Sequence, residues 1–124
     1  MRTNRILSGS LMGIAGFLLW AVLALAPQAH RIVEAWDTEF YWQVGIPALL
    51  ILQAGVGAWV RDRLWREPLC AVAGHFLAAM LIRPPGSDLG LLPLSIALIG
   101  APLFGALLLA ATLGRWARNT FAVG

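Results

Sequence analysis

The chain has no lysine, from which we infer no function, and only one cysteine, which narrows its chemistry. A single cysteine, Cys70, excludes an internal disulfide and any Cys-x-x-Cys redox or zinc motif. We expect Cys70 to pack as a small apolar side chain, as free cysteines usually do. Charged residues are also scarce, at 12% of the 124 residues, whereas soluble domains are about 25% charged. The chain is therefore poor in groups that face water.

Motifs of catalysis are missing as well. The sequence has no Gly-rich phosphate loop, no His-Glu-x-x-His metal motif and no serine elbow. No charged residue lies deep in an apolar stretch, which disfavours an ion-coupled transporter with a central carboxylate. The two halves show no obvious repeat, unlike those of many transporters. We therefore predict a protein that is not an enzyme.

Long apolar stretches are what the chain has in abundance. Hydrophobic residues make up 60% of it, and a spanning helix needs about 20 such residues in a row. The first stretch is longer than the apolar core of a signal peptide, about 7–15 residues, so we expect it to be retained. We predict an all-α membrane protein, a single domain over residues 1–124 that forms an antiparallel bundle of four transmembrane helices. The predicted spans are residues 6–26, 43–60, 67–83 and 89–114.

The arginines predict an orientation. Four spans place seven arginines on the side of the two termini, namely Arg2, Arg5, Arg61, Arg63, Arg66, Arg115 and Arg118. Only Arg31 and Arg83 fall on the other side. Because cytoplasmic loops of membrane proteins carry an excess of arginine and lysine, we expect both termini in the cytoplasm of a bacterial inner membrane. Scattered arginines without a stacking face do not indicate nucleic-acid binding.

Aromatic residues support this frame, since Trp and Tyr prefer the depth of the headgroups. Trp59, Trp65 and Trp116 fall at the inner interface, and Trp36, Tyr41 and Trp42 fall at the outer one. The connection 27–43 is the only one long enough to carry structure, and its spacing predicts a short external amphipathic helix. His30, Glu34, Asp37 and Tyr41 share one face of that helix. This face is either an ordinary solvated surface or a weak cation site, and we predict no metal.

Small residues and prolines mark the predicted helices. Residues spaced by four let helix backbones approach closely in lipid. Such pairs serve either packing inside one bundle or docking of another subunit. Pro47 and Pro102 should kink their helices, because proline lacks an N–H and frees a carbonyl one turn earlier. The candidate packing residues are Gly9, Gly13, Ala97, Ala101, Gly105, Ala106, Ala110 and Gly114.

Two polar residues lie within the predicted spans. His75 is near the middle of the third span, and Gln53 is at a similar depth in the second. Ionisable groups inside a membrane are costly and often functional. We predict that His75 is a neutral hydrogen-bonding residue. Its partner is either a backbone carbonyl freed by Pro47 or Pro102, or Gln53, which we prefer because the two helices are neighbours. Proton relay and ligation of a porphyrin-like ring are the other possible roles of His75.

The residues around His75 carry one short resemblance. The stretch Ala71-Val72-Ala73-Gly74-His75-Phe76-Leu77-Ala78, followed by Arg83-Pro84, resembles the membrane span of bacterial light-harvesting β polypeptides. The resemblance implies that His75 binds bacteriochlorophyll, or by extension haem. It covers about a dozen residues, it differs in the spacing of Arg83, and it lacks the tryptophans beside the Arg-Pro pair. We predict no cofactor.

These patterns favour a non-catalytic function. Packing motifs are abundant and convergent reactive groups are lacking, so we expect an accessory or assembly subunit of a larger membrane complex. The alternative is a small channel or transporter that forms its pathway as an oligomer, with Gln53 and His75 lining it between the kinks. A third reading is a pigment- or haem-binding subunit that uses His75.

Overall fold

The structure is a computed structural model, and it describes residues 2–24, 39–61, 63–82 and 92–122. Within these residues every regular element is helical, which confirms the predicted all-α class. The predicted external helix falls largely in residues 25–38, outside the described part. In chain order the elements are α1 (Arg2–Ala24), the π-helical turn η3 (Tyr41–Gly45), α2 (Ile46–Trp59), α3 (Arg66–Leu81), α4 (Leu92–Ser95), the π-helical turn η5 (Ile96–Gly100) and α5 (Ala101–Phe121).

Three of these helical segments are long and apolar enough to cross a membrane. Among the described residues they cover Asn4–Val22, Tyr41–Trp59 and Pro93–Phe121. Helix α3 has only 16 residues, with Arg66 and Glu67 in its first turn, and it falls short of the usual 20 or so. The chain is therefore a helical protein suited to a membrane, with a fourth, shorter helix beside the three long ones.

The last helix is longer than predicted. We expected it to end at Gly114, yet α5 continues to Phe121. A glycine followed by arginine usually suggests a helix end at a membrane surface. Here Gly114 is instead buried at a contact with α2, and three of the next four residues, Arg115, Ala117 and Arg118, are good helix formers. Helix α5 therefore extends two turns beyond its apolar part.

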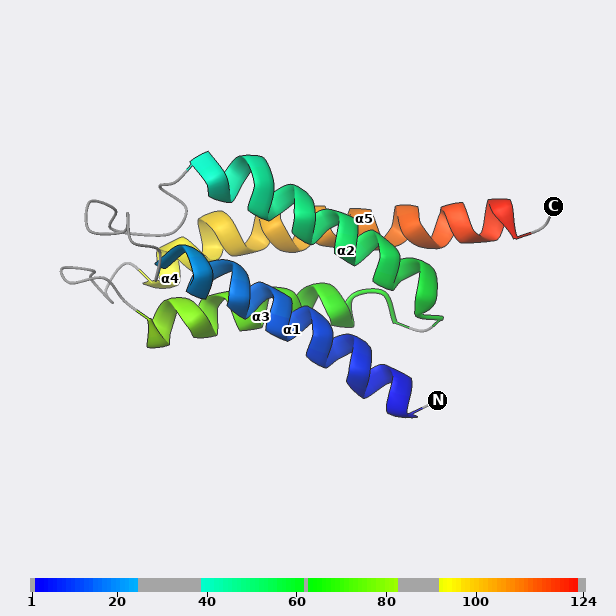
Figure 1. Cartoon of the computed structure of the whole chain (residues 1–124), viewed down its shortest axis with the longest axis horizontal. Helices are drawn as coiled ribbons and strands as arrows, with labels where there is room; N and C mark the ends of the chain where they lie inside the picture. The colour runs from blue at the N-terminus through cyan, green and yellow to red at the C-terminus, as the bar shows by residue number, and fades with distance from the viewer. Residues whose placement is uncertain (1, 25–38, 62, 83–91, 123–124) are drawn as a thin grey trace.

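The helices pack as two pairs of parallel partners. Helix α1 packs mainly against α3, and α2 packs mainly against α5. Figure 1 shows both members of each pair running in the same direction. The start of α1, the connection from α2 to α3, and the end of α5 all lie toward one end of the bundle. This end, which we call the arginine end, carries all seven arginines within the described residues.

Backbone contact holds the first pair together. A Cβ atom added to Gly16 would overlap the carbonyl of Ala71, and one added to Gly74 would overlap the carbonyl of Gly13. The contact is reciprocal, with a glycine from each helix facing the backbone of the other. Such closeness is possible only without a side chain, and it replaces lipid with dense van der Waals contact.

The second pair crosses in the same way. A Cβ atom on Gly57 would overlap the backbone of Ala111, and one on Gly114 would overlap the backbone of Ala54. All four helices therefore carry a small residue followed three positions later by glycine. The predicted spacing of four is wrong for these crossings, because the crossing residues are three apart.

These matching contacts reveal an internal repeat that is not obvious from the sequence. Residues 11–23 (LMGIAGFLLWAVL) and 69–81 (LCAVAGHFLAAML) are identical at six aligned positions. Residues 50–61 (LILQAGVGAWVR) and 107–118 (LLLAATLGRWAR) are also identical at six. In both matches the crossing glycine is among the identical residues. The repeated helices are therefore the ones that pack against each other.

Each predicted kink coincides with a π-helical turn. Turn η3 ends at Gly45, two residues before Pro47, and turn η5 ends at Gly100, two residues before Pro102. In η3 the N–H of Ile46 donates to the carbonyl of Tyr41, five residues earlier. The helix widens where proline cannot donate, so the chain stays helical across each proline. Pro93 lies in the first turn of α4.

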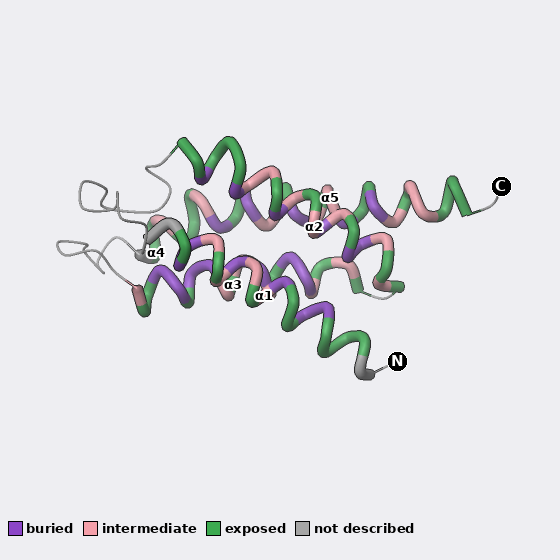
Figure 2. Tube along the Cα trace, viewed as in Figure 1, coloured by how far each residue is buried: buried purple, intermediate pink, exposed green. Residues whose placement is uncertain are grey.

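The outside of the bundle is apolar. Figure 2 shows buried stretches along the inner helix faces and exposed stretches around them. Many of the exposed side chains are large and hydrophobic, among them Ile6, Ile51, Leu81, Leu98 and Leu109. Exposing such side chains to water costs roughly 1.5–3 kcal/mol each relative to burial. Lipid hydrocarbon around the bundle removes this cost, which agrees with the three candidate membrane spans.

We expect Gly74→Ala to destabilise the bundle, because its new methyl group overlaps the backbone of Gly13. Overpacking of this kind costs about 1–3 kcal/mol. The matched control is Gly55→Ala, since nothing lies within 4 Å of a Cβ at Gly55. That change should be neutral or stabilising, because alanine favours a helix over glycine by about 1 kcal/mol. Thermal unfolding in detergent compares the two, and equal melting temperatures would contradict the crossing.

Candidate functional site

Arginines from α5 cover the end of α2. Arg118 donates from Nη1 to the carbonyl of Ala58 at 2.7 Å, and Arg115 donates from Nη2 to the carbonyl of Val60 at 3.2 Å. Helix α2 has no glycine cap, and its last carbonyls need other donors. The two arginines meet this need. Their role in the bundle is therefore structural.

A buried carboxylate joins α1 to α3 at the same end. Glu67 is 2% exposed, and the hydroxyl of Ser8 donates to its Oε1 at 2.9 Å. Arg66 Nε lies 3.9 Å from the same oxygen, and Arg66 Nη2 donates to the carbonyl of Arg5. The predicted third span begins at Glu67, and the structure places this residue in the first turn of α3. Its place directly before Pro68, which can begin a helix, was the available signal for a first-turn position.

His75 is the centre of a buried polar and aromatic cluster. It is fully buried on α3, and its Nε2 lies 3.2 Å from the hydroxyl of Tyr41. Trp20 and Phe76 each present an edge-to-face contact to the imidazole, at ring-centroid distances of 5.3 and 5.4 Å. The indole N–H of Trp20 donates to the carbonyl of Ile82 at 3.2 Å. The cluster therefore ties α1, η3 and α3 together.

This arrangement corrects the predicted position of Tyr41. We expected Tyr41 at the outer membrane interface, but its side chain is fully buried. The π turn η3 directs it inward, where it meets His75. His30, Glu34 and Asp37, the other members of the predicted polar face, lie outside the described residues, as does Trp36. Trp42, Trp59, Trp65 and Trp116 are exposed, as residues of an interfacial belt would be.

Gln53 is not the partner of His75. Its side chain is 1% exposed, and neither its amide nitrogen nor its amide oxygen has a hydrogen-bond partner among the described residues. His75 is engaged with Tyr41 instead. Depth alone suggested the pairing, and depth does not determine on which side of a helix a residue lies.

A ring cofactor on His75 would need rearrangement of this cluster. The imidazole is enclosed by Trp20, Tyr41 and Phe76, and its Nε2 already faces the Tyr41 hydroxyl. An axial ligand must present a ring nitrogen to open space large enough for a macrocycle. Tyr41 or Trp20 would have to move before the implied bacteriochlorophyll or haem could bind there.

The predicted packing residues divide into two groups. Gly13 and Gly114 lie at the two helix crossings, and Gly9 faces the side chains of Arg66 and Cys70. Ala110 is half-buried. The remaining residues face outward on η5 and α5, and nothing lies within 4 Å of a Cβ at Gly105. The outward-facing group is Ala97, Ala101, Gly105 and Ala106.

Comparisons with known proteins give no match. No protein-family model, no curated protein and no solved structure matches the chain. The geometry of the chain's own residues is therefore the basis for a functional proposal.

We expect Gln53→Leu to leave stability unchanged or to raise it, because the buried amide has no partner among the described residues. Replacing an unsatisfied polar group by an apolar one removes a desolvation cost of about 1–3 kcal/mol. Tyr41→Phe is the contrasting variant, since it removes the hydroxyl that meets His75. It should lower stability by about 0.6 kcal/mol, the average for side-chain hydrogen bonds in a membrane protein, and by at most about 1.7 kcal/mol. Destabilisation by Gln53→Leu, measured by thermal unfolding in detergent, would reveal a required amide contact.

Proposed function

We propose that the chain is a non-catalytic subunit of a larger membrane complex, and that it docks through an outward face of η5 and α5. This docking face consists of Ala97, Ala101 and Gly105, spaced by four residues. The observation that carries the proposal is the openness of Gly105, where nothing lies within 4 Å of a Cβ. Both alanines are exposed as well.

The docking face differs from the glycines at the two helix crossings, because those contact another helix of the bundle. At the two crossings, glycines are used to bring α1 to α3 and α2 to α5. The docking face has the same composition, and no helix among the described residues packs against Gly105. Small residues let two helix backbones approach closely. Because lipid tails are as apolar as leucine, burial of apolar side chains does not drive helix association in lipid, and close packing has to do so.

A second open glycine offers a useful contrast. Gly55 on α2 also has nothing within 4 Å of a Cβ. Its neighbours one turn away are Ile51 and Trp59, which are large and exposed. These side chains would keep a partner helix away from the Gly55 backbone. Gly105 has one large exposed neighbour, Leu109, one turn after it and the small Ala101 one turn before it, so the face on α5 is the better site for a transmembrane partner.

We also propose four spans, with α3 as a short fourth crossing. Its direct backbone contact with α1 supports this, because α3 then lies at the depth of a long span. Arg66 at one end can extend toward the headgroups and compensate for the short length. The arginine end faces the cytoplasm in this arrangement, following the arginine bias. A bacterial inner membrane remains the expected location.

An oligomeric channel is the alternative, and the burial of the polar residues bears on it. Gln53 and His75 are enclosed within a single chain. A pathway between copies would need to be lined by other residues. Self-association through the docking face would nevertheless be seen as a homo-oligomer without another protein when the tagged chain is isolated.

We expect Gly105→Leu to abolish copurification of the partner, because a leucine side chain separates the two backbones. Gly55→Leu is the matched control, since it adds the same side chain at an equally open glycine. The measurement is isolation of the tagged chain from its native membrane in mild detergent, followed by mass spectrometry. Loss with both variants, or with neither, would refute the docking face. A lone homo-oligomer lost only in Gly105→Leu would favour self-association over an accessory role.

Four spans place both termini on one side of the membrane, whereas three spans place them on opposite sides. Asn4→Cys and Asn119→Cys, each in a Cys70→Ala background, introduce single thiols at exposed positions near the two ends. We expect neither thiol to react with an impermeant maleimide in intact cells, and both to react after permeabilisation. Reaction of only one in intact cells would show that α3 does not cross.

A further inference from the structure

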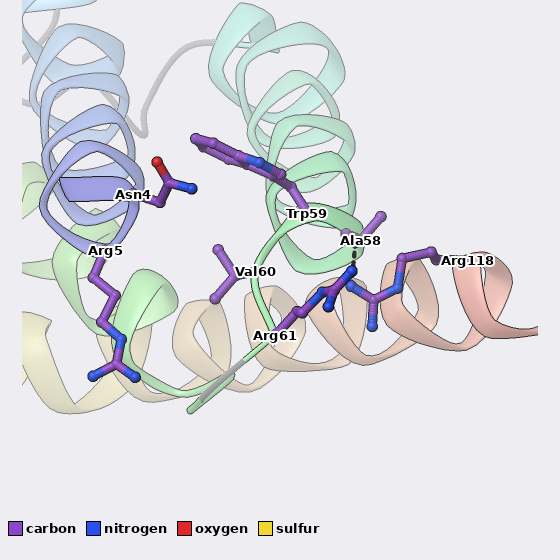
Figure 3. A pocket seen from close by; sticks show the side chains of 7 residues that line it. All are labelled: Asn4, Arg5, Ala58, Trp59, Val60, Arg61 and Arg118. Atoms are coloured by element: carbon purple, nitrogen blue, oxygen red, sulfur yellow. Dashed lines mark hydrogen bonds between the residues drawn. The ribbon is translucent and has the colours of Figure 1, made fainter. Parts of the chain in front are cut away.

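A basic cleft opens at the arginine end, away from the docking face. It lies among the first turns of α1, the end of α2 and the last part of α5, and its volume is about 460 Å³. Pockets of about 300–1,000 Å³ accommodate small ligands. Figure 3 shows the lining side chains around the end of α2. These are Asn4, Arg5, Ala58, Trp59, Val60, Arg61 and Arg118.

The cleft is strongly cationic. Three of its seven described lining residues are arginines and none of the seven is acidic. Arg61 is exposed, and it makes no hydrogen bond or ion pair with another residue that the structure describes. Asn4 and Trp59 add neutral N–H donors. This combination suits an anion that accepts several hydrogen bonds.

One of the arginines is held in place before any ligand arrives. Arg118 Nη1 donates to the carbonyl of Ala58, and its Nε and Nη2 lie 3.4 and 3.2 Å from Asn119 Oδ1. A guanidinium has five N–H donors, so an anchored arginine can still reach a ligand. Anchoring reduces the side-chain entropy lost on binding.

The internal repeat points to the same residues. Arg61 and Arg118 occupy equivalent positions, each two residues after an equivalent tryptophan, Trp59 or Trp116. Most polar positions differ between the two matched segments, yet these arginines are identical. The structure brings both of them to one cleft although they are far apart in the chain.

We propose that this cleft binds the phosphate of an anionic phospholipid headgroup. Arginine is suited to phosphate because its planar fork can donate two parallel hydrogen bonds. Trp59 lies at the end of a candidate span, where tryptophans commonly sit at the depth of the headgroups. Basic pockets between membrane helices recognise anionic headgroups. Ile6 and Leu7 are exposed on the neighbouring turn of α1, where acyl chains would continue along the protein. That apolar continuation favours a lipid over free phosphate.

The test uses the full chain in a neutral detergent, titrated with short-chain phosphatidylglycerol, short-chain phosphatidylcholine and inorganic phosphate, each followed by native mass spectrometry. We expect saturable binding of phosphatidylglycerol, at least tenfold tighter than binding of either other probe. Arg61→Gln should weaken it about tenfold, the scale of one hydrogen bond to a charged group. Arg61→Lys should restore part of the loss, because it keeps the charge without the planar fork.

The matched control is Arg63→Gln. Arg63 is exposed, lies two residues from Arg61 and does not line the cleft. Its replacement by glutamine changes the net charge by the same amount as Arg61→Gln. We expect less than a twofold effect from it. Equal weakening by Arg61→Gln and Arg63→Gln would reduce the effect to general surface charge and overturn the site. Equal affinity for phosphatidylcholine, or binding of inorganic phosphate as tight as that of the lipid, would overturn the headgroup assignment.

Discussion

Direct contact between helix backbones is the constraint on which this bundle depends. Water does not drive helices together within lipid, so close van der Waals packing has to do so. Gly16 and Gly74 allow α1 and α3 to touch, and Gly57 and Gly114 do the same for α2 and α5. A methyl group at any of these positions would separate the pair. These four glycines, which have a hydrogen atom in place of a side chain, therefore determine which helices pair.

The pairing then determines which polar groups meet. Contact of α1 with α3 brings Ser8 to Glu67, and it places Trp20 against His75. Contact of α2 with α5 lets Arg118 reach over the end of α2. The polar chemistry of the chain is therefore concentrated in two places, an aromatic cluster inside the bundle and an arginine-rich end.

Apolar stretches and arginines were enough to predict the helices, because hydrophobicity and length decide whether a segment forms a spanning helix. They did not predict the side on which each residue lies. Gln53 and His75 have similar predicted depths but different neighbours, and Tyr41 is buried although its type and position favour an interface. The arginines were assigned to orientation alone, because hydrogen bonds to distant carbonyls such as those of Ala58 and Val60 depend on tertiary contact. The repeat is hard to recognise in the sequence because its matching residues are common apolar ones. Only the reciprocal glycine contacts in the structure identify the positions at which the helices cross.

The two π turns have a consequence for the pattern of faces along each helix. A π turn contains about one residue more than an α turn, and one residue advances an α-helix by about 100°. Residues spaced by four drift slowly around an α-helix, because four residues turn it by about 400°. Tyr41 and Gly45 within η3, and Leu49 and Gln53 after it, are spaced by four and are all buried. The extra residue of the π turn therefore offsets the drift, and one row of side chains stays on the inner side of the bundle past Pro47.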